Sequence, residues 1–204
     1  LGMTTTDIGT ATLDLANALV IQPDDKIVVV GGSAGSFAVL RYGADGTLDP
    51  GFGTGGKVTT PIGAGGAQAR AVALQEDGMI VVAGTVGYGT ALVRYGMDGA
   101  LDPAFGSGGI VTLAAGATWS AAAYAVAVDG SGNVVVAGET ALYSTSTNSL
   151  DFFVARYTST GVLDATFSGD GLAFADFKSS TYTSGSALAD HAYALAILED
   201  GSVV

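Results

Sequence analysis

The chain has 204 residues, 49% of them hydrophobic, yet no run approaches the 18 or so consecutive apolar residues of a membrane helix, so we expect no membrane insertion. Its formal net charge is −12 with only seven Lys plus Arg, which argues against a nucleic-acid partner because a phosphate backbone needs basic patches. The absence of cysteine excludes disulfides and cysteine-ligated metals.

The first strong signal in chain order is a block that runs from Ala18 to Gly31. It joins an alternating apolar run to a β-branched run through a short polar turn. The block returns at 71–84 and at 125–138, and a fourth copy starts at Ala194. Each copy predicts two strands joined by a tight turn, because alternation and β-branched runs bounded by Asp and Gly are typical of a hairpin.

A second block follows each copy of the first and spans 37–56, 90–109 and 152–171. It contains Arg-Tyr, an Asp-Gly turn, Leu-Asp and Phe, although the third copy has Thr158–Thr160 where the Asp is expected. One repeat unit consists of a strand of the Lys57–Thr60 type, followed by the first block and then the second block. Four short strands are therefore predicted in each unit. The units recur roughly every 50 to 60 residues, which is the size of a propeller blade.

These patterns predict an all-β, β-propeller-like fold of tandem four-stranded antiparallel blades, with three complete units plus a partial fourth. We treat 1–204 as a single repeat array with units at approximately 1–53, 54–106, 107–168 and 169–204 (partial). Closed propellers usually have about four to eight blades, so we expect an incomplete propeller. It is either a fragment of a longer protein or a ring that further repeats or a second copy would close, since an open end exposes a strand edge.

The combined pattern is A-x-A-x-Q-x-D-G-x-I-V-V-A-G followed by R-Y-x-x-D-G-x-L-D-x-x-F-G-x-x-G. This pattern resembles the delta-60 repeat, and the resemblance covers essentially the whole chain. It implies tandem bacterial repeats of large exported or surface proteins, taken to be β-propeller blades. The expected location is therefore extracytoplasmic, either secreted or at the bacterial cell surface. The resemblance implies no established activity.

Charged residues that recur at matched positions are interpreted as structural, because a site needs to occur once whereas a repeated group reuses the same contact. They are Arg41, Arg94, Arg156, Asp49, Asp102 and Asp164. We predict no catalytic residue. The segment Gly51–Lys57 imitates a phosphate-binding loop, but Val58 stands where Ser or Thr should bind magnesium, and no helix follows.

One turn has a calcium-loop pattern. Asp129, Ser131 and Asn133 place oxygen side chains at alternate positions, but the later Glu of a calcium loop is missing. The segment also aligns with Glu76–Gly78, an ordinary hairpin turn. We interpret it as a turn, with calcium binding as the alternative, and we expect no other cofactor.

Loop parity indicates which end of the blades to search for a ligand. In an antiparallel meander, successive loops alternate between the two ends, so the repeated Asp-Gly turns gather at one end. The loops at the other end vary, and both large insertions, Glu139–Asp151 and Phe177–His191, fall there. We call this end the variable face; inserted loops of repeat proteins commonly carry binding. Its candidate ligand-binding residues are Tyr88, Trp119, Tyr143, Tyr182 and His191.

These features favour a non-enzymatic binding or adhesion module of an exported bacterial protein, with a glycan or protein ligand on the variable face. One alternative is a purely structural repeat scaffold, in which the loops are tolerant of insertion and their aromatics cap the core. The other is a propeller-based polysaccharide-degrading enzyme, which would need convergent acids or histidines. The variable face offers few of these: Glu139, Asp151, Asp190 and His191.

Overall fold

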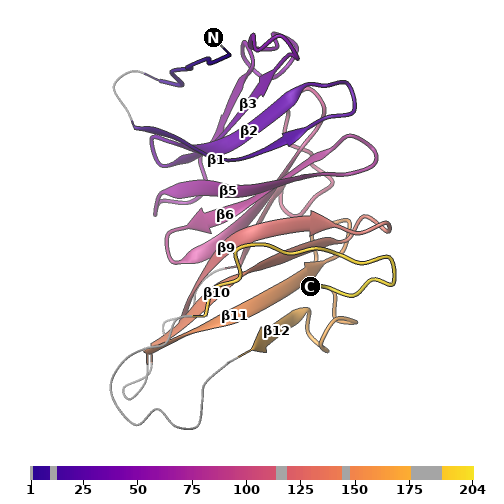
Figure 1. Cartoon of the computed structure of the whole chain (residues 1–204). Helices are drawn as coiled ribbons and strands as arrows, with labels where there is room; N and C mark the ends of the chain where they lie inside the picture. The colour runs from indigo at the N-terminus through magenta and orange to yellow at the C-terminus, as the bar shows by residue number, and fades with distance from the viewer. Residues whose placement is uncertain (1, 10–12, 114–118, 144–147, 176–189) are drawn as a thin grey trace.

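The computed structural model describes residues 2–9, 13–113, 119–143, 148–175 and 190–204 (Figure 1). This part of the chain contains twelve β-strands and no helix, and therefore no helix long and apolar enough to cross a membrane. The all-β prediction is confirmed.

The strands form three four-stranded antiparallel sheets, each a meander in chain order, that lie side by side without closing into a ring (Figure 1). The first sheet consists of β1 (Asp14–Ile21), β2 (Ile27–Ser33), β3 (Ser36–Tyr42) and β4 (Lys57–Thr60). The second consists of β5 (Ala67–Leu74), β6 (Ile80–Val86), β7 (Gly89–Tyr95) and β8 (Ile110–Leu113). The third consists of β9 (Trp119–Val128), β10 (Val134–Tyr143), β11 (Asn148–Tyr157) and β12 (Leu172–Ala175).

The sheets are offset from the sequence units by one strand. We placed Lys57–Thr60 at the start of the second unit, but this strand pairs with β3 and is the last strand of the first sheet. The reason is local: the Gly-rich turn after the Arg-Tyr strand folds straight back, and the Arg41 N–H donates to the Gly56 carbonyl at 3.0 Å. This corrects the strand grouping, while the four-strand composition of each blade holds.

The core lies between successive sheets, which explains the continuous apolar run of β6. Ile80 and Val82 pack in the cluster between the first and second sheets, whereas Val81 and Ala83 pack in the cluster between the second and third. Alternate residues of a strand point to opposite faces, so a middle sheet buries both sets. Each cluster also holds a buried Phe from a Gly-rich turn, Phe52 in the first cluster and its repeat equivalent in the second.

The partial fourth unit is described from residue 190 onward. Its chain runs beside β9 and forms a short antiparallel arm in which Ala196 and Val204 exchange two backbone hydrogen bonds of 2.7 and 3.0 Å (Figure 1). The structure thus contains three four-stranded sheets and the beginning of a fourth, as the repeat pattern predicts.

Candidate functional site

The repeated arginines act as links between neighbouring sheets. Arg41 Nε donates to Asp49 Oδ2 at 2.8 Å, and its guanidinium carbon lies 4.7 Å from the centre of the Phe52 ring. The same guanidinium donates to the backbone carbonyl of Met97, which belongs to the Asp-Gly turn of the next sheet. A side chain that crosses the sheet boundary in this way stabilises blade stacking.

Arg94 makes the equivalent contacts one sheet later. It donates to Asp102 at 2.7 Å and to the carbonyl of Ser159 in the third sheet at 2.6 Å, and it lies 4.7 Å from the Phe105 ring. The backbone N–H of Ala104 and the Arg94 guanidinium together hold the pKa of Asp102 below its usual value of 3.8, against the opposing effect of burial. The pair is nearly inaccessible to solvent, as expected of a packing element.

Arg156 repeats the pairing within its own sheet. It donates to Asp164 at 2.7 Å and lies 5.0 Å from the Phe167 ring. It also donates to the Thr166 hydroxyl at 2.8 Å instead of to a carbonyl of another sheet, and its side chain is 24% exposed. This exposure is larger than that of the other two repeated arginines, because a neighbouring sheet covers each of them.

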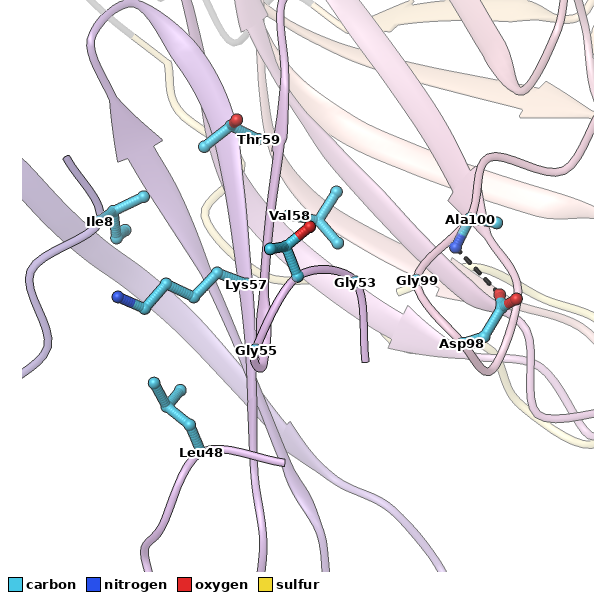
Figure 2. A pocket seen from close by; sticks show the side chains of 11 residues that line it. Ile8, Leu48, Gly53, Gly55, Lys57, Val58, Thr59, Asp98, Gly99 and Ala100 are labelled. Atoms are coloured by element: carbon cyan, nitrogen blue, oxygen red, sulfur yellow. Dashed lines mark hydrogen bonds between the residues drawn. The ribbon is translucent and has the colours of Figure 1, made fainter. Parts of the chain in front are cut away.

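The segment that imitates a phosphate-binding loop borders a hollow of about 900 Å³ between the first two sheets (Figure 2). Two backbone N–H groups beside the hollow are hydrogen-bonded within the protein. The Gly53 N–H donates to the Asp98 carbonyl at 2.7 Å, and the Ala100 N–H donates to the Asp98 carboxylate at 3.0 Å. Lys57 points away from Asp98, and its ammonium donates to the Asp7 carbonyl at 2.5 Å (Figure 2). The loop serves sheet-to-sheet hydrogen bonding.

The calcium-like segment is organised as a hairpin turn. Asp129 Oδ1 accepts hydrogen bonds from the N–H groups of Ser131 at 2.8 Å and Asn133 at 2.9 Å, and Oδ2 accepts one from the Asn133 amide at 2.9 Å. Within the described ranges, no three His, Cys, Asp or Glu side chains are grouped to hold a metal ion. The interpretation as a turn agrees with these bonds, and calcium binding stays the untested alternative.

The variable-face candidates are spread over several elements. Tyr88 lies in the β6–β7 hairpin with its side chain 77% exposed, and its carbonyl accepts a hydrogen bond from the Ala121 N–H at 2.8 Å. Trp119 begins β9 and Tyr143 ends β10, but the surroundings of these two side chains lie outside what the structure describes. Tyr182 lies outside the described residues altogether.

The first insertion differs from the loop that we expected. Most of Glu139–Asp151 extends the β10–β11 hairpin, whose ladder continues to Tyr143 and Asn148. The two strands have ten residues each, compared with seven in β6 and in β7. The added residues are largely compatible with a strand, so the ladder simply lengthens.

A groove of about 500 Å³ runs across the first strands of the sheets and is the strongest candidate site. Strands β1, β5 and β9 are in contact in that order, and residues 193–195 follow beside β9. Each of these three strands, and the segment 193–195, contributes the residue immediately before the repeated alanine of its block. These residues are Asn17, Arg70, Tyr124 and Tyr193.

A β-bulge presents three of these four residues. Strand pairing passes directly from Ala69 to Ala71 in β5 and thus leaves Arg70 unpaired, and the same irregularity occurs at the equivalent positions of β1 and β9. The bulge requires a glycine opposite it: a β-carbon on Gly84 would lie 2.1 Å from the Gln68 carbonyl oxygen. Gly31 and Gly138 have the same close approach, at 1.7 and 1.9 Å. Bulges re-aim side chains, and here they turn one residue per sheet toward the groove.

At one end of the groove, a polar cluster joins the third sheet to the fourth unit. The Tyr124 hydroxyl donates to Glu139 Oε1 at 2.8 Å, and Glu139 Oε2 pairs with His191 Nδ1. The Tyr193 ring lies 5.3 Å from the Tyr124 ring and 5.3 Å from the His191 ring. Burial, followed by the neighbouring Glu139 carboxylate, raises the pKa of Tyr124 to about 12, so its phenol stays protonated at neutral pH.

Arg70 is the cation of the groove. Its guanidinium carbon lies 5.4 Å from the Tyr124 ring centre, and its Nε is buried without a hydrogen-bond partner. No salt bridge joins Arg70 to an acidic side chain among the described residues, whereas the three repeated arginines each pair with an Asp. Arg70 is not among the residues that the sequence pattern pointed to. The available signal was that the position before the repeated alanine changes chemical type from unit to unit inside an otherwise constant block.

A family model described as a domain of unknown function (DUF5122) beta-propeller matches residues 22–52, 75–105 and 130–167. The chain is a tandem repeat of the β-propeller type. The matches support this type of repeat without singling out the delta-60 repeat, which stays a prediction. No curated protein matches the chain.

The crystal structure of a protein from Lactobacillus plantarum is 20% identical in sequence with a TM-score of 0.46. The similarity covers 74% of this chain and 40% of that chain, so this chain spans less than half the length of its structural relative.

In a β-propeller, the blades surround a central channel, and the groove lies on the strands that open each sheet of this array. The array supplies an arginine, aromatic rings and an amide at this surface. The one carboxylate in the cluster, Glu139, is bonded by both Tyr124 and His191. The groove therefore combines a cation, aromatic rings and an amide, which are groups that can hold a ligand.

Proposed function

We propose that this chain is a non-enzymatic binding module of an exported or cell-surface bacterial protein, with a glycan or protein ligand held in the groove and on the adjoining variable face. The observation that carries the proposal is the series of bulged groove residues, which differ in chemical type while the surrounding frame repeats. A residue that only supports the frame would be expected to recur, as the arginine links do.

The groove and the variable face are neighbours in each sheet. Strand β5 starts at the variable end, after the loop that follows β4, and Arg70 is its fourth residue. Tyr193 also lines the groove and is 68% exposed, and such aromatic side chains commonly contact sugars and peptides through a flat apolar ring with a polar tip. The absence of cysteine and the resemblance of the repeats to those of exported bacterial proteins support the extracytoplasmic location.

The test is a binding screen of the purified chain against a panel of bacterial and plant oligosaccharides and a peptide library, read by isothermal titration calorimetry. For any ligand found, Tyr193→Ala is expected to weaken binding at least roughly tenfold, equivalent to about 1.4 kcal/mol. Trp119→Ala and Tyr143→Ala test the variable face in the same way.

The matched control is Phe174→Ala, because Phe174 is a 59% exposed aromatic on β12, the last strand of the third sheet. Its replacement is expected to leave affinity unchanged. If no saccharide or peptide binds at millimolar concentration, the structural scaffold is the better account of the chain. Equal effects of the control and groove variants would refute the site assignment.

A further inference from the structure

We propose that the groove binds a saccharide that carries a carboxylate, a uronic acid unit, and that Arg70 is the residue that recognises the carboxylate. This inference rests on the proposed function and names the ligand class of the same groove. Tyr124, Tyr193 and the small apolar side chains that line the groove contact the sugar.

The case for Arg70 starts from the contrast with the other arginines. Arg41, Arg94 and Arg156 each bond an Asp eight residues later. Arg70 lacks that Asp at the corresponding distance, where Gly78 stands. The Nε of Arg70 is buried without a partner, but the side chain as a whole is only half-buried, so a ligand would meet its terminal nitrogens. With no acidic side chain paired to Arg70 among the described residues, these nitrogens suit a ligand that supplies the acceptor.

The orientation of Arg70 fits a carboxylate. Its guanidinium lies over the Tyr124 ring, and an arginine stacked on an aromatic face keeps the edge of its planar fork for two parallel hydrogen bonds to a carboxylate. The nearest acidic side chain of the cluster, Glu139, is bonded to Tyr124 and His191. Arg70 therefore gives the groove a positive group that the polar cluster does not use.

The charge of the whole chain restricts the ligand further. With a net charge of −12, the protein repels a dense polyanion, and repulsion between exposed charges acts over about 8 Å at physiological salt. A short acidic saccharide whose carboxylate reaches Arg70 avoids most of that repulsion. The ligand is therefore expected to be a short oligosaccharide with few carboxylates, one of which lies at the arginine.

The size and lining of the groove favour a sugar over a protein surface. Its volume of about 500 Å³ falls in the range of about 300 to 1,000 Å³ typical of small-ligand sites. Ala71, Ala125 and Ala194 also line the groove and provide small apolar surfaces. Asn17 uses its amide nitrogen to donate to the Ala69 carbonyl at 2.6 Å, which leaves its side-chain oxygen to accept from a sugar hydroxyl.

The experiment compares digalacturonic acid with galactobiose, its neutral counterpart, by calorimetry on the full 204-residue chain. Digalacturonic acid is expected to bind at least tenfold more tightly than galactobiose. Arg70→Gln should remove that preference, Arg70→Lys should retain only part of it because Lys lacks the planar fork, and Tyr193→Ala should weaken both sugars.

Two controls separate recognition from folding and from overall charge. Thermal melting and near-ultraviolet circular dichroism of each variant establish that the fold is kept. Lys57→Gln removes one positive charge far from the groove, at the hollow of Figure 2, and is expected to leave the affinity for digalacturonic acid within twofold.

The outcomes distinguish this inference from the proposed function. Equal binding of the two disaccharides, or an Arg70→Gln variant with unchanged preference, overturns the carboxylate assignment. Binding of tetraglutamate with no binding of digalacturonic acid also overturns it and identifies an acidic peptide as the ligand class. In each of these cases, the proposed function as a binding module is retained if any ligand loses affinity in Tyr193→Ala. If no saccharide or peptide binds, both proposals are rejected.

Discussion

Replacing Gly84 with Ala is expected to destabilise the second sheet and to disorganise the groove at the same time. The added β-carbon would lie 2.1 Å from the Gln68 carbonyl oxygen and 2.8 Å from the Ala69 Cα, both backbone atoms of the bulged strand. Real β-carbons essentially never approach a heavy atom within 3.0 Å, so the two strands must separate by about 0.9 Å or the bulge must be lost. Overpacking of this kind costs about 1 to 3 kcal/mol.

For a chain of this length, that loss corresponds to a decrease of about 2 to 12 °C in melting temperature. The assay is urea unfolding followed by circular dichroism, together with thermal melting. Gly130→Ala is the matched control, because a β-carbon at Gly130 would meet nothing within 4 Å, and its effect is expected to stay within about 0.5 kcal/mol. The reasoning is refuted if Gly84→Ala is as stable as Gly130→Ala.

Two other predictions concern the repeated ion pairs. Arg94→Ala removes the bond to Asp102 and the 2.6 Å bond to the third sheet, and it should lower the free energy of unfolding by about 2 to 4 kcal/mol. Arg156→Ala should cost less, because the second bond of Arg156 goes to Thr166 instead of to another sheet. Equal urea midpoints for the two variants would contradict this account. The pKa values of Asp49, Asp102 and Asp164 are lowered from 3.8, so these carboxylates stabilise the fold above that pH and lose their contribution as the pH falls through the lowered values. Urea midpoints should therefore decrease from pH 5 to pH 3, with a smaller decrease in Asp102→Asn; a midpoint that does not change with pH would argue against the proposed role of the carboxylates.

The blade architecture could be predicted from the sequence because its determinants are local and repeat. Alternation, β-branched runs and Asp-Gly turns each act over a few residues, so their recurrence identifies four strands per unit without any knowledge of the tertiary structure. The grouping of strands into sheets was less accessible. Lys57–Thr60 looks the same in sequence whether it starts one sheet or ends another, and only its ladder with β3 decides.

The candidate site illustrates a different limit. Tyr88 could be proposed as a candidate because an aromatic side chain in a variable loop is visible in the sequence, although it does not line the groove. Arg70 was overlooked because it lies inside a regular strand, where alternation alone assigns each side chain to one of two faces. The bulge breaks that alternation, and its presence depends on the carbonyl of Gln68 lying over Gly84 in the neighbouring strand.

The sequence by itself therefore determined the repeated frame: the strands, the turns, and the arginine and aspartate positions that recur in every unit. The tertiary structure decided which residues meet across the frame. Arg94 reaches the third sheet, and Glu139 meets His191 from 52 positions away. Contacts between sheets depend on how the blades stack, and no local pattern encodes that stacking directly; for this reason the groove with Arg70 and Tyr124 emerged only from the folded chain.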